Sequence, residues 1–193
     1  MLQIVLIRPG ATEYDVQHRI QGSLDISLNE QGLKEVAALA EQLREKGLEV
    51  IYSPTSQPAL QTAELLADVL ALKHKKIDLP NLNLGLWQGM LISDVRHKLP
   101  KVYRQWQEQP ESVCPPEGEM LAAADERVRA VIIKLLKRQK EGVIGLVLPE
   151  PLYSLAARFI AHRELGDLWK AANGHGQYEV FAVQPEELLA AEV

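Results

Sequence analysis

Short apolar runs alternate with amphipathic stretches along most of this 193-residue chain. The apolar runs predict strands buried on both faces, and the amphipathic stretches have the period of helices with one buried side. Such alternation is typical of an α/β fold, a three-layer sandwich with a mostly parallel central sheet and helices on both faces. No repeat, low-complexity segment or linker interrupts it, so residues 1–193 are expected to form a single domain. The predicted strands are 2–7, 50–53, 143–148 and 178–183, and the predicted helices are 27–47, 58–72, 93–107, 120–140 and 149–162.

Local signals set the expected ends of the helices. Ser27 and Glu30 have the spacing of a capping box at the start of the first helix. Pro58 suits the first position of the second helix, and Pro100 is expected to end or kink the helix that contains it. The cluster "KHKK" at 73–76 is interpreted as the charged end of a helix.

Composition limits the class of partner and the compartment. The net charge of −5 and the pI near 5.6 disfavour nucleic acid and anionic membranes as partners. Cys114 is the only cysteine, so neither a disulfide framework nor a zinc cluster of cysteines is predicted, and a reducing cytoplasm fits. The short N-terminal apolar run ends at Arg8 without a basic segment before it, which disfavours a signal peptide. No metal site and no cofactor are predicted.

Functional side chains are expected where the predicted strands end. Arg8, Ser53 and Pro149 all follow strands at their carboxyl ends, where parallel sheets bind ligands. Arg8 is a charged residue at the end of a buried strand, and the residue after it, Pro9, has no backbone N–H group. A charge in this place is typical of a binding site, whereas the proline removes a hydrogen-bond donor from it.

Seven segments occur in a fixed order that resembles one known family. They are "RPGATEYD" (8–15), "RIQG" (19–22), "LNEQG" (28–32), "SPTSQPALQTA" (53–63), "LPNLNLGLWQG" (79–89), "PPEGE" (115–119) and "VLPE" (147–150). In this order and spacing the chain resembles the histidine phosphatase superfamily, the phosphoglycerate mutase-like proteins. The resemblance implies the α/β fold already expected from the alternation of strands and helices.

The resemblance also implies what the chain lacks. Proteins of this family transfer a phosphoryl group to a histidine, hold its oxygens with two arginines and a second histidine, and protonate the leaving group with an acid. By motif, the nucleophile falls on Pro9, the second arginine on Pro58, the acid on Asn81 and the second histidine on Pro149. Of this set only Arg8 remains. Proline can neither attack, donate nor transfer a proton, so the family chemistry is predicted to be absent.

The residues around these positions form the candidate ligand-binding set. Asp15 stands where the family has an asparagine that contacts phosphate, and Ala11 stands where it has an acidic residue. Negative charge from Asp15 and Glu150 predicts poor phosphate binding, because it would cancel the field of Arg8. Whether Arg8 pairs with Asp15 or Glu150 or binds a ligand stays open, as does a turn or capping role for the residues of the pocket mouth. The set is Arg8, Gly10, Thr12, Asp15, Arg19, Gln21, Ser23 and Glu150.

The leading hypothesis is a catalytically inactive pseudoenzyme that binds a protein or a small molecule. Regulation of an active homologue, a scaffold role, homo-oligomerisation and a receptor for a weakly charged ligand all stay open. The rival is a weak or altered phosphatase that uses His18, otherwise an exposed loop residue, or water activated by Asp15. A third hypothesis is an apolar pocket for a small molecule between the prolines. His175 lies in a glycine turn whose spacing assigns it no role, and Trp87, Tyr103 and Trp106 are expected to pack within the protein.

Overall fold

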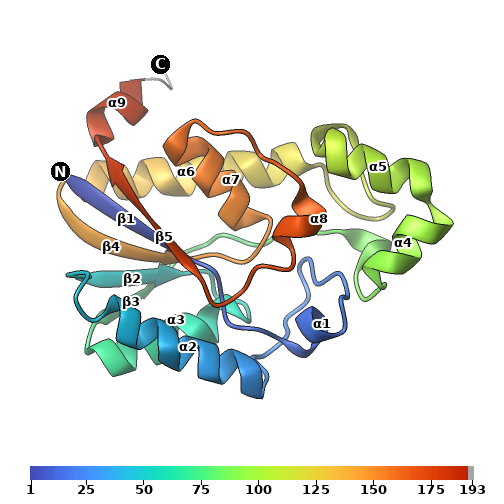
Figure 1. Cartoon of the computed structure of the whole chain (residues 1–193). Helices are drawn as coiled ribbons and strands as arrows, with labels where there is room; N and C mark the ends of the chain where they lie inside the picture. Colours follow the sequence, from blue (N-terminus) through green and yellow to red (C-terminus); the bar gives the residue numbers. More distant parts are fainter. Residues whose placement is uncertain (191–193) are drawn as a thin grey trace.

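The computed structural model describes residues 1–190, and its centre is one five-stranded sheet (Figure 1). The strand order is β3-β2-β4-β1-β5, with β5 antiparallel to β1 and the other neighbours parallel. This confirms the predicted α/β class and the mostly parallel sheet; residues 191–193 of the expected domain lie outside the described residues. The strands are β1 (Leu2–Ile7), β2 (Val50–Ser53), β3 (Lys73–Lys76), β4 (Gly142–Val147) and β5 (Tyr178–Val183).

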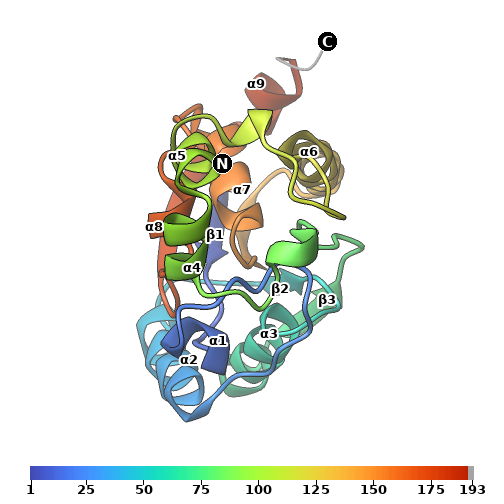
Figure 2. The ribbon, with the colours of Figure 1, turned by 90° about the vertical axis from the view of Figure 1, so that its right-hand side faces the viewer.

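Helices cover both faces of the sheet, as Figures 1 and 2 show. The helices α2 (Glu30–Leu43) and α3 (Ala59–Leu70) lie on one face, and α6 (Leu121–Arg138) and α7 (Leu152–Ala161) lie on the other. Side chains of β1 alternate between the two resulting cores, because successive residues of a strand point to opposite faces. Val5 and Ile7 pack into the core beside α2 and α3, and Leu2, Ile4 and Leu6 pack into the core beside α6 and α7.

A third group of elements surrounds the carboxyl ends of the parallel strands. It consists of α1 (Glu13–Val16), α4 (Ile92–Lys98), α5 (Pro100–Glu108), α8 (Leu168–Ala171) and the short 3₁₀ turns Gly85–Trp87 and Pro110–Ser112. An aromatic cluster of Trp87, Tyr103, Trp106 and Trp169 joins them; Tyr103 stacks on Trp169 with ring centroids 5.0 Å apart. The predicted break at Pro100 is confirmed, because Pro100 is the first residue of α5. The helix α9 (Pro185–Ala190) follows β5.

Two local predictions were wrong. The cap of α2 is Asn29, whose side-chain oxygen accepts a hydrogen bond from the Gly32 N–H at 2.8 Å, and not Ser27. The "KHKK" segment forms the edge strand β3 rather than the end of a helix. Its residues carry no apolar alternation, so the pattern gives no sign of a strand; charged lysines are nevertheless common at sheet edges, where they oppose pairing with another chain.

No helix within residues 1–190 combines the length and the apolar composition that a crossing of the bilayer needs.

Candidate functional site

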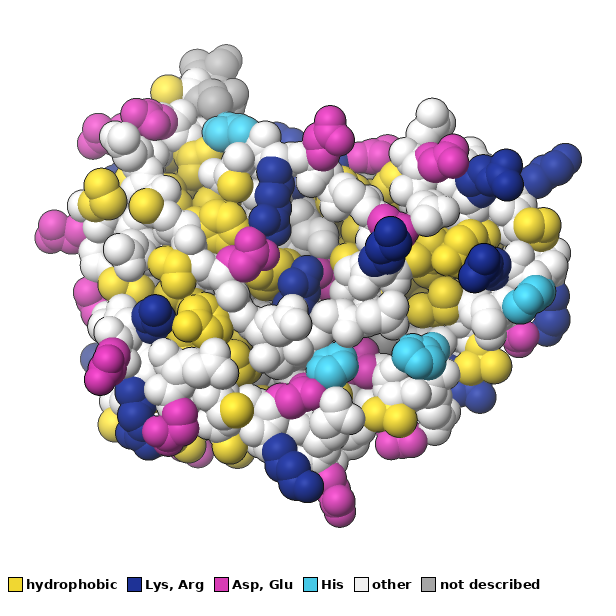
Figure 3. Space-filling model, in the orientation of Figure 1, with side chains coloured by type: hydrophobic (Ala, Val, Ile, Leu, Met, Phe, Trp, Pro, Cys, Tyr) yellow, Lys and Arg dark blue, Asp and Glu magenta, His cyan; other side chains and the backbone are white. Residues whose placement is uncertain are grey.

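A pocket lies beyond the carboxyl ends of β1 and β4, where ligands bind in parallel sheets. Its volume is about 100 Å³. The loop after β1, the loop before the Gly85–Trp87 turn, residues 149–151, α5 and the segment from α8 to β5 all contribute to its wall. In Figure 3, histidine and acidic side chains lie close together at the surface around α1.

Arg8 does not line this pocket, and its guanidinium is held in an ion pair. Its Nε and Nη2 atoms donate to Oε1 of Glu150 at 3.0 and 2.6 Å, and its guanidinium lies 3.9 Å from the centre of the Tyr153 ring. The other carboxylate oxygen of Glu150 accepts a hydrogen bond from the Ser154 hydroxyl at 2.7 Å. The two side chains of the ion pair are only 16% and 10% exposed. Arg8 therefore contacts Glu150 rather than Asp15, and its positive charge is neutralised beside the pocket.

Four prolines contribute to the pocket wall. Pro9, Pro58, Pro149 and Pro151 all line the pocket, and none of them has an N–H group or a side-chain donor. The carbonyl oxygen of Pro9 accepts a hydrogen bond from the Gly176 N–H at 2.7 Å. This bond holds the loop before β5 against the end of β1.

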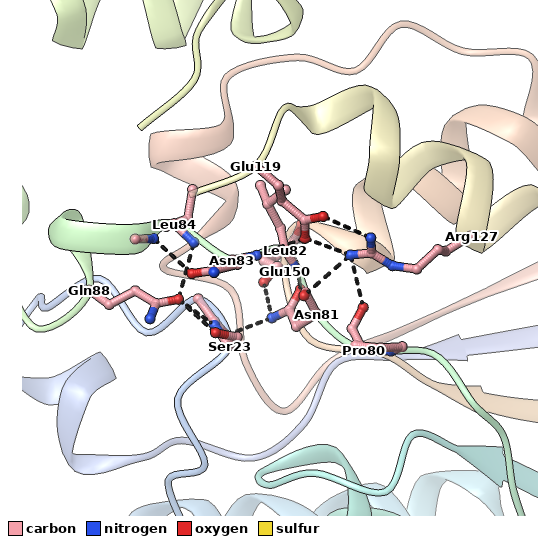
Figure 4. A network of polar contacts seen from close by, with 12 residues as sticks. Ser23, Pro80, Asn81, Leu82, Asn83, Leu84, Gln88, Glu119, Arg127 and Glu150 are labelled. Carbon is pink, nitrogen blue, oxygen red and sulfur yellow. Dashed lines mark hydrogen bonds and ion pairs between the residues drawn. The ribbon is translucent and has the colours of Figure 1, made fainter. Parts of the chain in front are cut away.

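Asn81 ties together three loops of the pocket (Figure 4). Its Nδ2 group donates to the carbonyl oxygens of Gly22 and Glu150 at 2.9 and 3.0 Å, and its Oδ1 accepts from the Leu82 N–H at 2.8 Å. The residue is 8% exposed. Both amide hydrogens are thus used in structural hydrogen bonds, and the side chain has no proton to offer a leaving group.

An ion pair supports the Asn81 loop from behind. The guanidinium of Arg127 donates to both carboxylate oxygens of Glu119, at 2.7 and 2.8 Å, and also to the carbonyl oxygen of Pro80 at 3.3 Å. Oε1 of Glu119 accepts from the Asn83 N–H at 2.9 Å. Hydrogen bonds from Arg127 are the main reason that the pKa of Glu119 lies below its ordinary value. Figure 4 shows these groups arranged around the loop.

A side-chain amide holds the neighbouring turn. Oε1 of Gln88 accepts from the N–H and the hydroxyl of Ser23, at 2.8 and 2.9 Å, and from the Leu84 N–H at 3.1 Å. Ser23 is exposed, whereas Leu84 lines the pocket. Arg19 also joins this turn, since its Nη1 donates to the Gly89 carbonyl oxygen at 2.7 Å.

Asp15 is a carboxylate of the pocket wall that also caps a helix. Its Oδ2 accepts from the N–H and the hydroxyl of Thr12, the N-cap of α1, at 2.6 and 2.9 Å. Burial raises the pKa of Asp15 above its ordinary value, and the hydrogen bonds from Thr12 oppose this rise. Thr12 is fully buried, and its contacts are those of the N-cap of α1, one of the two roles that the sequence left open for it.

His175 lines the pocket beside Asp15 and is held by a carboxylate from α2. Its Nδ1 atom lies 2.9 Å from Glu35, whose oxygens also accept from the Ala11 N–H at 2.9 Å and from the Gln31 amide at 2.8 Å. Because a carboxylate only accepts hydrogen bonds, Nδ1 of His175 carries a proton, and in the neutral ring Nε2 is then the acceptor. Within residues 1–190, Nε2 has no hydrogen-bond partner.

Residues 4–190 match the model of the histidine phosphatase superfamily, branch 1. The chain belongs to this superfamily. Phosphoserine phosphatase 1 of Hydrogenobacter thermophilus is 29% identical over 186 residues, which are 95% of this chain and 88% of that protein. A bifunctional protein of Mycobacterium tuberculosis is 34% identical over 129 residues, 66% of this chain but only 35% of that protein.

Solved structures of similar fold include a mycobacterial glucosyl-3-phosphoglycerate phosphatase and the YhfR protein of Bacillus stearothermophilus. The first is 25% identical with a TM-score of 0.79, covering 92% of this chain and 88% of that chain. The second is 23% identical with a TM-score of 0.81, covering 95% of each chain, and this likeness concerns the fold.

Within this histidine phosphatase fold, the predicted site residues separate into two groups. Five of the eight candidate binding residues line the pocket: Gly10, Asp15, Arg19, Gln21 and Glu150. The other three, Arg8, Thr12 and Ser23, do not line it. Arg8 and Thr12 donate to Glu150 and Asp15, which do line it, whereas Ser23 donates to Gln88, which does not. Pro9, Pro58, Asn81 and Pro149, the four residues at which the sequence resemblance predicts substituted catalytic groups, all lie in the wall.

Sequence reasoning missed two further contributors to this superfamily pocket. His18, the histidine considered as a surrogate nucleophile, is exposed and does not line the pocket, whereas His175 does. No motif marks His175 or its partner Glu35, which is 140 positions away; only the return of the chain from α8 to β5 brings them together. Trp106 packs within the protein as expected, but it also forms part of the pocket wall.

Proposed function

We propose that this member of the histidine phosphatase superfamily does not perform phosphohistidine chemistry and acts as a binding protein. One observation carries the proposal. The positions that the resemblance assigns to the nucleophile, the second arginine, the acid and the second histidine all line one pocket, and they hold Pro9, Pro58, Asn81 and Pro149. A pocket built in this way has a place for a ligand but no group that attacks phosphorus or protonates a leaving group.

The charge of the pocket supports the same proposal. Transfer of a phosphoryl group requires fixed donors aimed at its oxygens. The superfamily arginine that remains, Arg8, already donates twice to Glu150. A phosphate dianion would have to displace this carboxylate and leave it buried without its partner, which is costly. Weak phosphate binding is therefore expected together with the absence of turnover.

Hydrolysis of phosphomonoesters tests the proposal. The purified chain is incubated with phosphoserine and with p-nitrophenyl phosphate, and released phosphate is measured beside the Arg8→Ala variant. The expected result is the same background rate in both. Hydrolysis that persists through successive purification steps and disappears in Arg8→Ala would contradict the proposal.

The second candidate is an altered phosphatase that uses a nucleophile foreign to the superfamily. Two observations favour it: the relative from Hydrogenobacter thermophilus is named a phosphoserine phosphatase, and Glu35 orients His175 at the pocket. Incubation with phosphoserine that carries a radiolabelled phosphate, followed by quenching in alkaline detergent, in which phosphohistidine survives, separates the candidates. A labelled protein that loses its label in His175→Ala, but keeps it in His18→Ala, would support the altered phosphatase. Loss of turnover in Asp15→Asn would instead support water activated by Asp15.

The partner of the proposed binding protein is either a macromolecule or a small molecule. A second copy of the chain is the simplest macromolecular partner. Light scattering coupled to size-exclusion chromatography measures the mass of the particle in solution and tests this part directly.

A further inference from the structure

We infer that the pocket binds a small organic cation, a protonated amine on a short apolar body. The inference rests on the proposed function, because a pocket that held a phosphomonoester for turnover would need the opposite charge. Four features of the pocket support it. The two arginines already have hydrogen-bond partners, Asp15 forms no ion pair with a lysine or arginine of the described residues, His175 offers a ring nitrogen, and the rest of the wall is largely apolar.

The arginines are already engaged. Arg8 is neutralised by Glu150, as its two hydrogen bonds to one carboxylate oxygen indicate. Arg19 is held by the Gly89 carbonyl oxygen at 2.7 Å and by the Gln17 side chain at 2.8 Å. An anionic ligand would therefore compete with the Glu150 carboxylate for Arg8 and with two neutral oxygens for Nε and Nη1 of Arg19.

Asp15 is in the opposite situation. It lines the pocket, and within residues 1–190 no lysine or arginine forms an ion pair with it. Thr12 supplies both hydrogen bonds to its Oδ2 atom, which leaves Oδ1 for a ligand. A partly buried carboxylate that lacks a counter-charge attracts a cation, and a charge-assisted hydrogen bond to an ammonium group is among the stronger polar contacts in proteins.

His175 supplies a second acceptor nearby. Its side chain lines the same pocket as Asp15. Glu35 holds a proton on Nδ1, which in the neutral ring leaves Nε2 as an acceptor. An ammonium group has three donors and can use Asp15 and Nε2 of His175 together.

The charged groups around the pocket come from several elements. Asp15 lies in α1 and Arg19 in the loop after it, Glu35 lies in α2, and the Arg8–Glu150 pair lies at the ends of β1 and β4. Three carboxylates and two guanidiniums thus lie in and around the pocket wall. Acidification should weaken binding, because it removes the charge of Asp15, whose pKa burial raises above its ordinary value.

The rest of the wall sets the size and the body of the ligand. It consists largely of the four prolines together with apolar side chains such as Leu84, Ile92 and Trp106. A volume of about 100 Å³ leaves room for a short alkyl or small cyclic amine. Such a body would exclude water from the apolar wall while the ammonium group reaches Asp15.

The test compares three probes of one shape: n-butylamine, n-butanol and butyrate, with inorganic phosphate as a fourth. Binding is followed by titration calorimetry and by the midpoint of thermal unfolding at concentrations up to about 10 mM, where millimolar affinities are visible. The expected result is binding of butylamine, with at least about tenfold weaker affinity for the other three. Preference for butyrate or phosphate, or failure of butylamine to bind, would overturn the inference.

Variants assign the effect to the pocket. Asp15→Asn keeps an oxygen for the Thr12 N–H but removes the charge, and it should weaken butylamine binding at least about tenfold. Asp78→Asn changes an exposed aspartate and should leave the affinity unchanged. Equal affinity in the Asp15→Asn variant would refute the inference. Phosphomonoester turnover would overturn the proposed function, whereas absent turnover together with absent amine binding would overturn this inference alone.

Discussion

Around Asn81 the pocket wall is a network of hydrogen bonds, whereas near the strand ends it consists of the rings of Pro9, Pro58 and Pro149. In the network, each polar group of the Asn81 side chain has a partner, and Glu119 and Arg127 hold the loop from behind. At the strand ends, the prolines offer neither a donor nor a charge.

The contrast separates two tasks of a superfamily pocket. Gln88 and Glu119 hold loops of the pocket by accepting hydrogen bonds from backbone N–H groups. The positions that the resemblance assigns to reacting groups line the cavity and hold Pro9, Pro58, Asn81 and Pro149. Asn81 belongs to both groups, because it lines the cavity and also ties its loops together.

The largest loss of stability is expected where the hydrogen-bond donor at position 81 is replaced by an acceptor. Asn81→Asp preserves the shape of the side chain but directs carboxylate oxygens at the carbonyl oxygens of Gly22 and Glu150. We expect a loss of about 3 kcal/mol in the free energy of unfolding at neutral pH, from two lost hydrogen bonds and a buried, repelled charge. Urea unfolding monitored by circular dichroism measures it.

The pH dependence of this variant provides its control. The introduced carboxyl group has a folded-state pKa raised above its unfolded value, so its protonation relieves the repulsion and the deficit should shrink as the pH falls. Asn173→Ala, at an exposed residue with one long hydrogen bond of 3.4 Å, should change the stability little. An Asn81→Asp variant as stable as wild type would show that the amide does not hold the loops.

A smaller loss is expected from Glu119→Gln, which removes the charge of the ion pair with Arg127 but keeps one acceptor. We expect about 1–2 kcal/mol at neutral pH. The folded-state pKa of Glu119 lies below its ordinary value of 4.5, chiefly because Arg127 donates to it. A lowered carboxyl pKa contributes stability above the unfolded value and loses it as the pH falls through the folded value.

The difference between wild type and Glu119→Gln should therefore be complete at neutral pH and decrease below pH 4.5. Urea unfolding at several pH values measures it. Glu41→Gln, in the exposed pair with Arg44, is the matched control and should show almost no difference. A difference for Glu119→Gln that stays constant down to acidic pH would contradict the role assigned to its charge.

A single substitution at the strand ends is expected to change activity not at all and stability only a little. Pro9→His restores the residue type that the resemblance expects. Arg8 nevertheless remains bound to Glu150, and the amide of Asn81 cannot act as an acid toward a leaving group. We expect no hydrolysis of p-nitrophenyl phosphate and no acid-labile phosphoprotein. Stability should fall by about 0.4–1 kcal/mol, because the unfolded chain gains freedom when proline is removed. Turnover in this variant would mean that the loss of one group alone explains the lack of chemistry.

Much of this arrangement follows from the sequence by simple physics, and the exceptions have identifiable causes. Periodicity predicts the layers, and the end of a buried strand predicts where Arg8 and Pro149 lie. Periodicity carries no strand direction, so the antiparallel pairing of β5 with β1 was not specified. The edge strand β3 is hydrated and charged, which leaves no apolar pattern to detect. The contact of His175 with Glu35 depends on how a loop packs against α2, and local sequence says little about this.

The smallest effect is expected at Ser23, a candidate binding residue that belongs to the network rather than to the cavity. Ser23→Ala removes one hydroxyl donor to Gln88, but the N–H groups of residues 23 and Leu84 still donate to the same oxygen. Stability should change by less than about 0.5 kcal/mol, as for other exposed substitutions, and butylamine affinity should not change. Calorimetric titration and urea unfolding measure both quantities. A marked loss of amine affinity in Ser23→Ala, without loss of stability, would extend the binding site to the Ser23–Gln88 turn and weaken the distinction between the groups that hold the loops and those that meet the ligand.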